Sequence, residues 1–177
     1  MSRFPVPGGL LLFAGLLLGG PCAGAAAAGV PLGAVVTGNG GQARLRPDLF
    51  VVRQLTPGRA PLELAVTTAD RTPQGRVTAL NLFVLRDGLT PGELKLLAAS
   101  AGRVAAACFG LGAGSRGDLI AWLSTRPRWG PQDLTRAFGP VQVGFTRGTT
   151  GDGAYTSVSI ARGGTPGGPA WKGYCTN

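Results

Sequence analysis

The 177-residue sequence contains no histidine, and this limits the chemistry that its side chains can perform. Without histidine, a serine or cysteine nucleophile lacks the base that the Ser-His-Asp and Cys-His mechanisms require. Histidine-based zinc and copper sites are excluded as well, and three cysteines are too few for a thiolate cage. The sequence therefore predicts no metal site and no cofactor.

Acid catalysis by two carboxylates is the one enzymatic mechanism that the composition leaves open. A glycosidase needs only two such groups at the right separation, one as acid and one as base or nucleophile. Each acidic residue considered also has a simpler role on a strand surface, in a turn, at a helix cap or in a hairpin loop. The acidic residues considered are Glu63, Asp70, Asp87, Glu93, Asp118, Asp133 and Asp152. A secreted hydrolase is therefore the alternative, and a non-catalytic protein is the favoured interpretation.

A group of arginines beside tryptophan is the clearest binding signal. Arg126, Arg128 and Arg136 flank Trp129, and Arg116 precedes them in a chain with 17 Lys+Arg against 8 Asp+Glu. Arginine next to an exposed aromatic ring can bind phosphates and stack on bases or sugars. These five residues predict a surface for an anionic polymer or envelope component. Nucleic acid is a less favoured partner, because no DNA- or RNA-binding signature is present. The competing interpretation places the tryptophans in the core and the arginines around its rim.

The segment 112–117, GAGSRG, matches the glycine pattern of dinucleotide-binding loops. That fingerprint requires a strand before the glycines, whereas a helix is predicted there. We therefore interpret the segment as a joint between two helices.

Cys108 and Cys175 are predicted to form a disulfide, because two cysteines remain in a chain that carries an export signal. The bond would fasten a glycine-rich C-terminus to the main helix. Two free thiols are the alternative.

The first 28 residues are predicted to be a signal peptide. Residues 10–18 form an apolar run of nine, too short to span a bilayer comfortably, and small residues follow it. Cleavage after Ala25 or Ala28 would release a secreted or periplasmic protein without a transmembrane span. An uncleaved anchor is one alternative. Another is a lipoprotein attached through Cys22, which Pro21 disfavours by fixing the backbone before the scissile bond.

One long helix over residues 90–112 organises the rest of the chain. Thr90, Pro91 and Glu93 have the spacing of a capping box, and Gly110 can supply the left-handed exit. Asp118 is predicted to cap a second helix that extends to about residue 125. A third, short helix is predicted over residues 129–138.

Strands are predicted on both sides of these helices from runs of apolar or alternating residues. They cover residues 49–52, 62–67, 77–85, 141–145 and 156–160, with 77–85 as a central strand covered on both faces. The strands at 62–67 and 77–85 are predicted to pair as one antiparallel hairpin, and those at 141–145 and 156–160 as another. The order of three strands, two or three helices and two strands predicts an α+β fold with an antiparallel sheet and helices on one face. Residues 29–43 are expected to be a flexible N-terminus, and residues 44–177 a single domain.

The sequence thus favours an exported, non-catalytic binding or envelope protein of basic charge. The predicted ligand is an anionic polymer, and the residues predicted to bind it are those around Trp129. An accessory subunit whose binding patch is covered by a partner is a further alternative.

Overall fold

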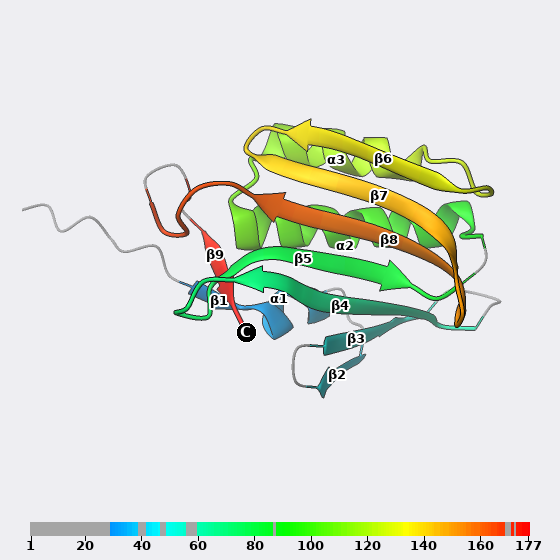
Figure 1. Ribbon diagram of the computed structural model, residues 1–177, viewed down its shortest axis with the longest axis horizontal. Helices are drawn as coiled ribbons and strands as arrows, with labels where there is room; N and C mark the ends of the chain where they lie inside the picture. Colours follow the sequence, from blue (N-terminus) through cyan, green and yellow to red (C-terminus); the bar gives the residue numbers. More distant parts are fainter. Residues whose placement is uncertain are drawn as a thin grey trace, which may run out of the picture.

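The computed structural model describes residues 29–38, 42–46, 49–55, 60–86, 88–168, 171 and 173–177. Its main feature is an antiparallel sheet with two long helices on one face (Figure 1). The predicted α+β fold is confirmed. The predicted signal peptide, Cys22 and Asp87 lie outside the described residues.

The sheet has seven strands in the order β2-β3-β4-β5-β8-β7-β6, and every neighbouring pair is antiparallel. β5 lies in the middle of this order, as predicted for residues 77–85. The predicted β4–β5 and β7–β8 hairpins are also confirmed. The strands are β2 (Gln42–Arg46), β3 (Leu49–Gln54), β4 (Leu62–Arg71), β5 (Val77–Val84), β6 (Gln132–Phe138), β7 (Val141–Thr150) and β8 (Gly153–Arg162).

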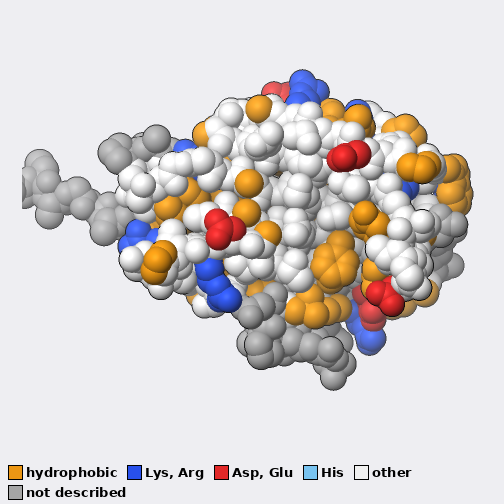
Figure 2. Space-filling model, in the orientation of Figure 1, with side chains coloured by type: hydrophobic (Ala, Val, Ile, Leu, Met, Phe, Trp, Pro, Cys, Tyr) orange, Lys and Arg blue, Asp and Glu red, His pale blue; other side chains and the backbone are white. Residues whose placement is uncertain are grey.

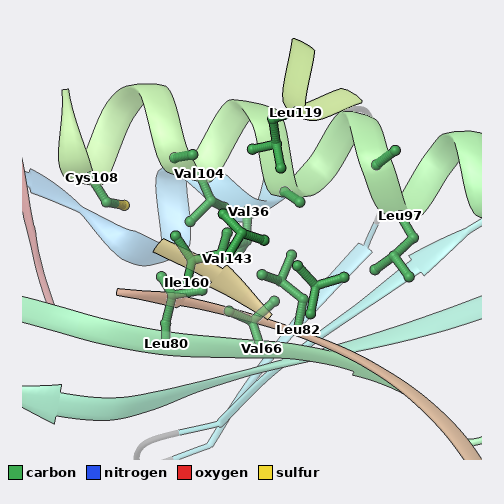
Figure 3. Close-up of a cluster of buried hydrophobic side chains, with 14 of the residues drawn as sticks. Val36, Val66, Leu80, Leu82, Leu97, Val104, Cys108, Leu119, Val143 and Ile160 are labelled. Atoms are coloured by element: carbon green, nitrogen blue, oxygen red, sulfur yellow. The ribbon is translucent and has the colours of Figure 1, made fainter. Parts of the chain in front are cut away.

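The long helix α2 (Pro91–Phe109) begins at the predicted capping box. The Glu93 backbone N–H donates to Thr90 Oγ1 at 3.2 Å, and the Thr90 backbone N–H donates to Glu93 Oε2 at 2.7 Å. Gly110 ends the helix with φ +65°, a left-handed conformation that glycine adopts without steric cost. Leu97 and Val104 of α2 point toward the sheet and meet Leu82 and its neighbours (Figure 3).

Two predictions about the following helices were wrong. α3 (Ala113–Ser124) begins six residues earlier than predicted, with Gly112 at the N-cap position. Asp118 therefore lies inside the helix, as do residues 113–117, which were predicted to be part of a joint between helices. Residues 132–138 form strand β6 rather than a third helix. Leu134, Ala137 and Phe138 have helical spacing, but Leu134, Arg136 and Phe138 also alternate. Pairing with β7 decides between the two patterns, because it provides backbone hydrogen bonds along the whole segment.

The prediction that β5 is covered on both faces was also wrong. Leu80, Leu82 and Val84 are buried under the helices, whereas Asn81 and Phe83 on the other face are only half-buried. Both long helices lie on the same side of the sheet (Figure 1). The opposite side is called the open face below.

Residues 29–38 pack on the body, in contrast to the flexible segment predicted for 29–43. They form β1 (Gly29–Pro31) and the short helix α1 (Leu32–Thr37), in which Leu32, Val35 and Val36 are buried. β1 pairs in parallel with β9 (Tyr174–Thr176), so the two ends of the described chain lie together. The spacing of the three buried residues is that of one helix face, a signal that the surrounding glycines obscure.

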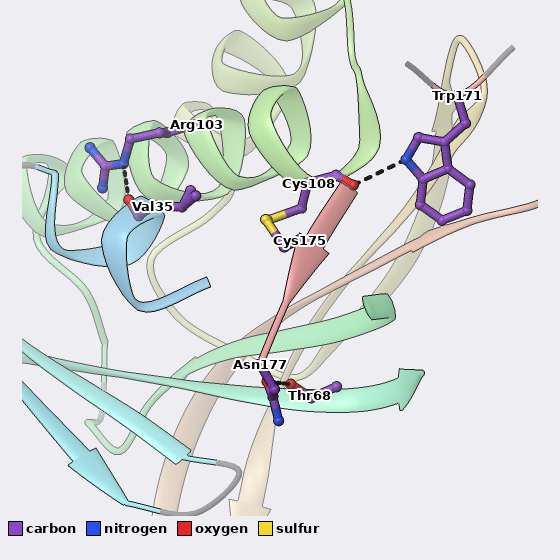
Figure 4. The surroundings of a disulfide bond; sticks show 7 residues. All are labelled: Val35, Thr68, Arg103, Cys108, Trp171, Cys175 and Asn177. Atoms are coloured by element: carbon purple, nitrogen blue, oxygen red, sulfur yellow. Dashed lines mark hydrogen bonds between the residues drawn. A yellow bond between two sulfur atoms is a disulfide. The ribbon is translucent and has the colours of Figure 1, made fainter. Parts of the chain in front are cut away.

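The predicted disulfide between Cys108 and Cys175 is present, with a Cα–Cα distance of 4.5 Å. It joins the last turn of α2 to β9 (Figure 4). The indole N–H of Trp171 donates to the Cys108 carbonyl oxygen at 3.1 Å, and both cysteines are fully buried. The C-terminal segment is therefore fixed to α2 by a covalent bond and by apolar packing.

Within the described part of the chain, no helix is both long enough and apolar enough to cross a membrane.

Removing the disulfide should destabilise the protein by about 4 kcal/mol, because the bond closes a long loop in the unfolded chain. The two cysteines are 67 residues apart in sequence. The double variant Cys108→Ala/Cys175→Ala, compared with wild type by urea unfolding, measures this loss. A reductant should weaken the wild type and leave the variant unchanged; equal stability of the two proteins would contradict a structural role for the bond.

The Glu93 cap should make stability depend on pH. Burial of Glu93 disfavours its carboxylate, but hydrogen bonds from Thr90 and the ion pair with Arg86 outweigh burial, so the pKa of Glu93 lies below its ordinary 4.5. This contribution is present above the ordinary value and is lost as the pH falls through the lowered pKa.

Urea unfolding of Glu93→Gln across this acidic range checks the assignment. The variant should lose about 1–2 kcal/mol near neutral pH and show a flatter acid limb than wild type. Glu63→Gln is the matched control, because Glu63 makes an exposed ion pair and should change stability by less than about 0.5 kcal/mol. An unchanged acid limb in Glu93→Gln would contradict the assignment.

Candidate functional site

Two of the predicted binding residues, Arg126 and Arg136, flank one pair of aromatic rings where α3 meets β6. The Arg126 guanidinium carbon lies 4.9 Å from the centre of the Trp122 ring. The Trp122 and Phe138 rings are 5.5 Å apart, and Arg136 lies 5.2 Å from the Phe138 ring. A planar cation on each side of an aromatic pair is a favourable arrangement, and it fixes both guanidinium groups in position. We call these four residues the arginine–aromatic stack.

Arg128 and Trp129 lie in the loop between α3 and β6. Arg128 Nε donates to the Leu89 carbonyl oxygen at 3.2 Å, and its guanidinium lies 5.6 Å from the Trp129 ring. Trp129 is 61% exposed and rests on Gly88, where an added Cβ would come within 2.2 Å of the indole. Trp129 is thus a surface residue whose ring packs directly on Gly88. Trp122, by contrast, is half-buried against the core.

The fifth predicted residue, Arg116, is exposed on the first turns of α3. Its side chain runs beside Gly102 of α2, where an added Cβ would lie 3.3 Å from Arg116 Cγ. Arg116 therefore packs along the groove between the helices rather than on the aromatic pair.

Arginine has a second role here that the sequence did not reveal. Many of its side chains donate to backbone carbonyl oxygens and so hold loops and helix ends to the body. Arg162 reaches the carbonyl of Phe109, the last residue of α2, and Arg126 reaches that of Trp122 in the last turn of α3. Neither helix has a basic residue in its own last turn, so these contacts supply the positive charge that a helix C-terminus favours. The other donor–acceptor pairs are Arg76–Pro166, Arg86–Pro61, Arg103–Val35, Arg128–Leu89 and Arg147–Pro127.

The helix side of the molecule carries a net positive charge. Residues 88–131, which include α2 and α3, contain five basic residues and two acidic ones. One of the two acids, Glu93, is fully buried and paired with Arg86. The helix side together with the arginine–aromatic stack therefore forms a basic surface.

The open face has a different character. Figure 2 looks onto this face, where charged side chains are sparse and the centre is mostly uncharged polar side chains and backbone, with some hydrophobic side chains among them. The strand register places small and neutral polar residues side by side across the sheet. One such row contains Thr67, Asn81, Ser159, Gly144 and Thr135. The two faces therefore differ in the ligand chemistry that they can accept.

A hollow of about 690 Å³ lies toward one end of the open face. Its apolar lining comes from β3, β4 and the end of β5, and three charged residues also border it. No pattern in the sequence indicated this hollow, because its lining residues come together only through strand pairing.

The described carboxylates give little support to acid catalysis. A general acid requires a raised pKa, but both carboxyl groups with a clearly shifted value have it lowered. A hydrogen bond from Thr78 at 2.6 Å and one from the Arg71 backbone lower the pKa of Asp70. Among the described residues, no three acidic or cysteine side chains are grouped so that they could hold a metal ion.

The chain matches no protein-family model, no curated protein and no solved structure.

Replacing Arg162 should test the structural role of the arginines. Arg162→Met keeps an apolar stem beside Trp171 but leaves the Phe109 carbonyl without this donor, so we expect a loss of about 2 kcal/mol in the free energy of unfolding. Arg136→Met is the control: because this side chain is exposed, replacing it should change the free energy of unfolding by less than about 0.5 kcal/mol. Urea unfolding measures both; equal losses would contradict the distinction.

Proposed function

We propose that the protein is exported and acts as a non-catalytic binding protein that attaches to an anionic polymer or envelope component. The contact surface would be the basic helix side, centred on the arginine–aromatic stack. The observation that supports this proposal most is that exposed arginines, among them Arg116, Arg128 and Arg136, lie on the helix side, whereas charged side chains are sparse on the open face.

The disulfide supports export, because such bonds persist in oxidising compartments. The signal peptide would be cleaved after Ala25 or Ala28, and strand β1 begins at Gly29. We therefore propose a secreted or periplasmic location, with attachment through Cys22 as the alternative.

Binding would rely on guanidinium groups that the fold already holds in place. Arg126 is fixed by its ring contact and by a 2.8 Å hydrogen bond from Nε to the Trp122 carbonyl oxygen. Guanidinium groups held in this way lose less conformational freedom when a phosphate, sulfate or carboxylate group binds. Release of counterions from the polymer would provide much of the affinity.

The alternative, a secreted hydrolase with two carboxylates, has less support. The two carboxyl groups with a shifted pKa are those of Asp70, which accepts a hydrogen bond from Thr78, and Glu93, which belongs to the α2 cap. The pKa of each is lowered, so both favour the ionised form. A raised carboxyl pKa in a cleft would be needed to favour this alternative.

Salt-dependent retention on heparin tests the proposal. Wild type should bind and elute at elevated salt, and Arg116→Gln/Arg136→Gln should elute earlier. If both side chains contact the polymer, the slope of log affinity against log salt should become shallower by about 1–2.

Arg53→Gln/Arg71→Gln is the control for net charge, because it lowers the charge of the protein by the same two units at exposed positions of β3 and β4. It should shift elution less than the helix-side pair. Elution of wild type at very low salt, or equal shifts for the two double variants, would overturn the proposed surface.

A further inference from the structure

The hollow on the open face has an almost continuous apolar floor. Val51, Ala65 and Phe83 lie directly opposite one another on β3, β4 and β5, so three adjacent strands contribute one row of side chains. Leu49 and Leu85 extend the lining, and Leu85 is 62% exposed. Ala65 is the smallest of the three in the row. Because the Ala65 side chain is only a methyl group, it leaves an open space between the larger side chains of Val51 and Phe83.

Exposed aliphatic side chains are also gathered at this end of the sheet. Leu55, which directly follows β3, is 85% exposed, and Leu85 directly follows β5. β3 and β5 both run antiparallel to β4, so they end at the same edge of the molecule. Large aliphatic residues this exposed, beside an apolar hollow, are typical of a binding site rather than of a solvated sheet face.

The charged residues at the rim are already neutralised within the protein. Arg53 Nε pairs with Glu63 Oε1 at 2.7 Å. Arg86 pairs with the buried carboxylate of Glu93, and its Nη2 donates to the Pro61 carbonyl oxygen at 3.2 Å. A charged ligand would have to compete with these partners for little electrostatic gain. The rim therefore favours a ligand without net charge, which can still accept hydrogen bonds from guanidinium N–H groups.

We propose that this hollow binds the apolar chain of an uncharged amphiphile, with the polar end of the ligand at the Arg53–Glu63 pair. The volume of about 690 Å³ falls within the range of small-molecule sites. The proposal does not depend on the anionic partner of the helix side, because the two surfaces use different residues on opposite faces of the sheet.

Calorimetry with probes that share one alkyl chain tests this site. Decyl maltoside is the uncharged probe, and decyl sulfate and decyltrimethylammonium are the charged ones, each used below micelle formation. Decyl maltoside should bind wild type, and Ala65→Phe should weaken binding at least about tenfold because the new ring occupies the hollow. Ala161→Phe is the matched control: it is an exposed alanine on the open face of β8, away from the hollow, and should leave affinity unchanged.

Leu85→Ser provides a second variant should Ala65→Phe fail to fold, since it changes an exposed side chain of the lining. It should weaken decyl maltoside binding by about threefold or more. No binding of decyl maltoside to wild type, or equal affinity of wild type and Ala65→Phe, would overturn the proposal. A preference of about tenfold or more for either charged probe that disappears in Ala65→Phe would overturn the assignment of an uncharged ligand.

Discussion

The packing of α2 on one face of the sheet is the constraint on which the rest of the structure depends. Its buried residues fill the space above β5 and β8, and its end is joined to β9 through Cys108. Because α3 packs beside α2 on the same side, no helix in the described part of the chain covers the other face of the sheet. The same arrangement therefore produces both candidate surfaces: a basic one over the helices and a nearly neutral one on the exposed strands.

Arginine side chains donate hydrogen bonds to many backbone carbonyl groups that helices and strands leave without a partner. The chain has 31 glycines and 14 prolines, so many connections lie outside helices and strands and expose backbone carbonyl groups. A long side chain with five N–H donors can reach such carbonyls from a neighbouring element. Much of the high positive charge is thus explained by stability, and fewer arginines than the composition suggests are available for a ligand. Arg116 and Arg136 are the clearest candidates that remain.

Local signals in the sequence were enough to predict the helix cap and the two hairpins, and the number of cysteines was enough to predict the disulfide. Thr90 and Glu93 form their hydrogen bonds within a single turn, and hairpin strands pair with their nearest neighbour in the chain. The failures have two causes. In residues 132–138, helical and alternating spacing overlap, and only pairing with β7 decides between them. Residues 29–38 pack on the body beside β9, at the other end of the chain, which no local pattern indicates. Of the five predicted site residues, the structure places two on one aromatic pair, a relation that depends on the contact between α3 and β6.

The start of α2 connects the surroundings of the two candidate surfaces. Arg86 at the rim of the hollow pairs with Glu93, which also caps the helix through Thr90. Two residues before the cap, Gly88 supports the Trp129 ring, and the carbonyl of Leu89 holds Arg128. These contacts all lie at the N-terminal end of α2, whose buried face is fully packed. They therefore set the positions of the rim of the hollow and of the loop that carries Arg128 relative to the same helix. A ligand on the open face and a polymer on the helix side would therefore be held at a fixed separation by one capped helix end.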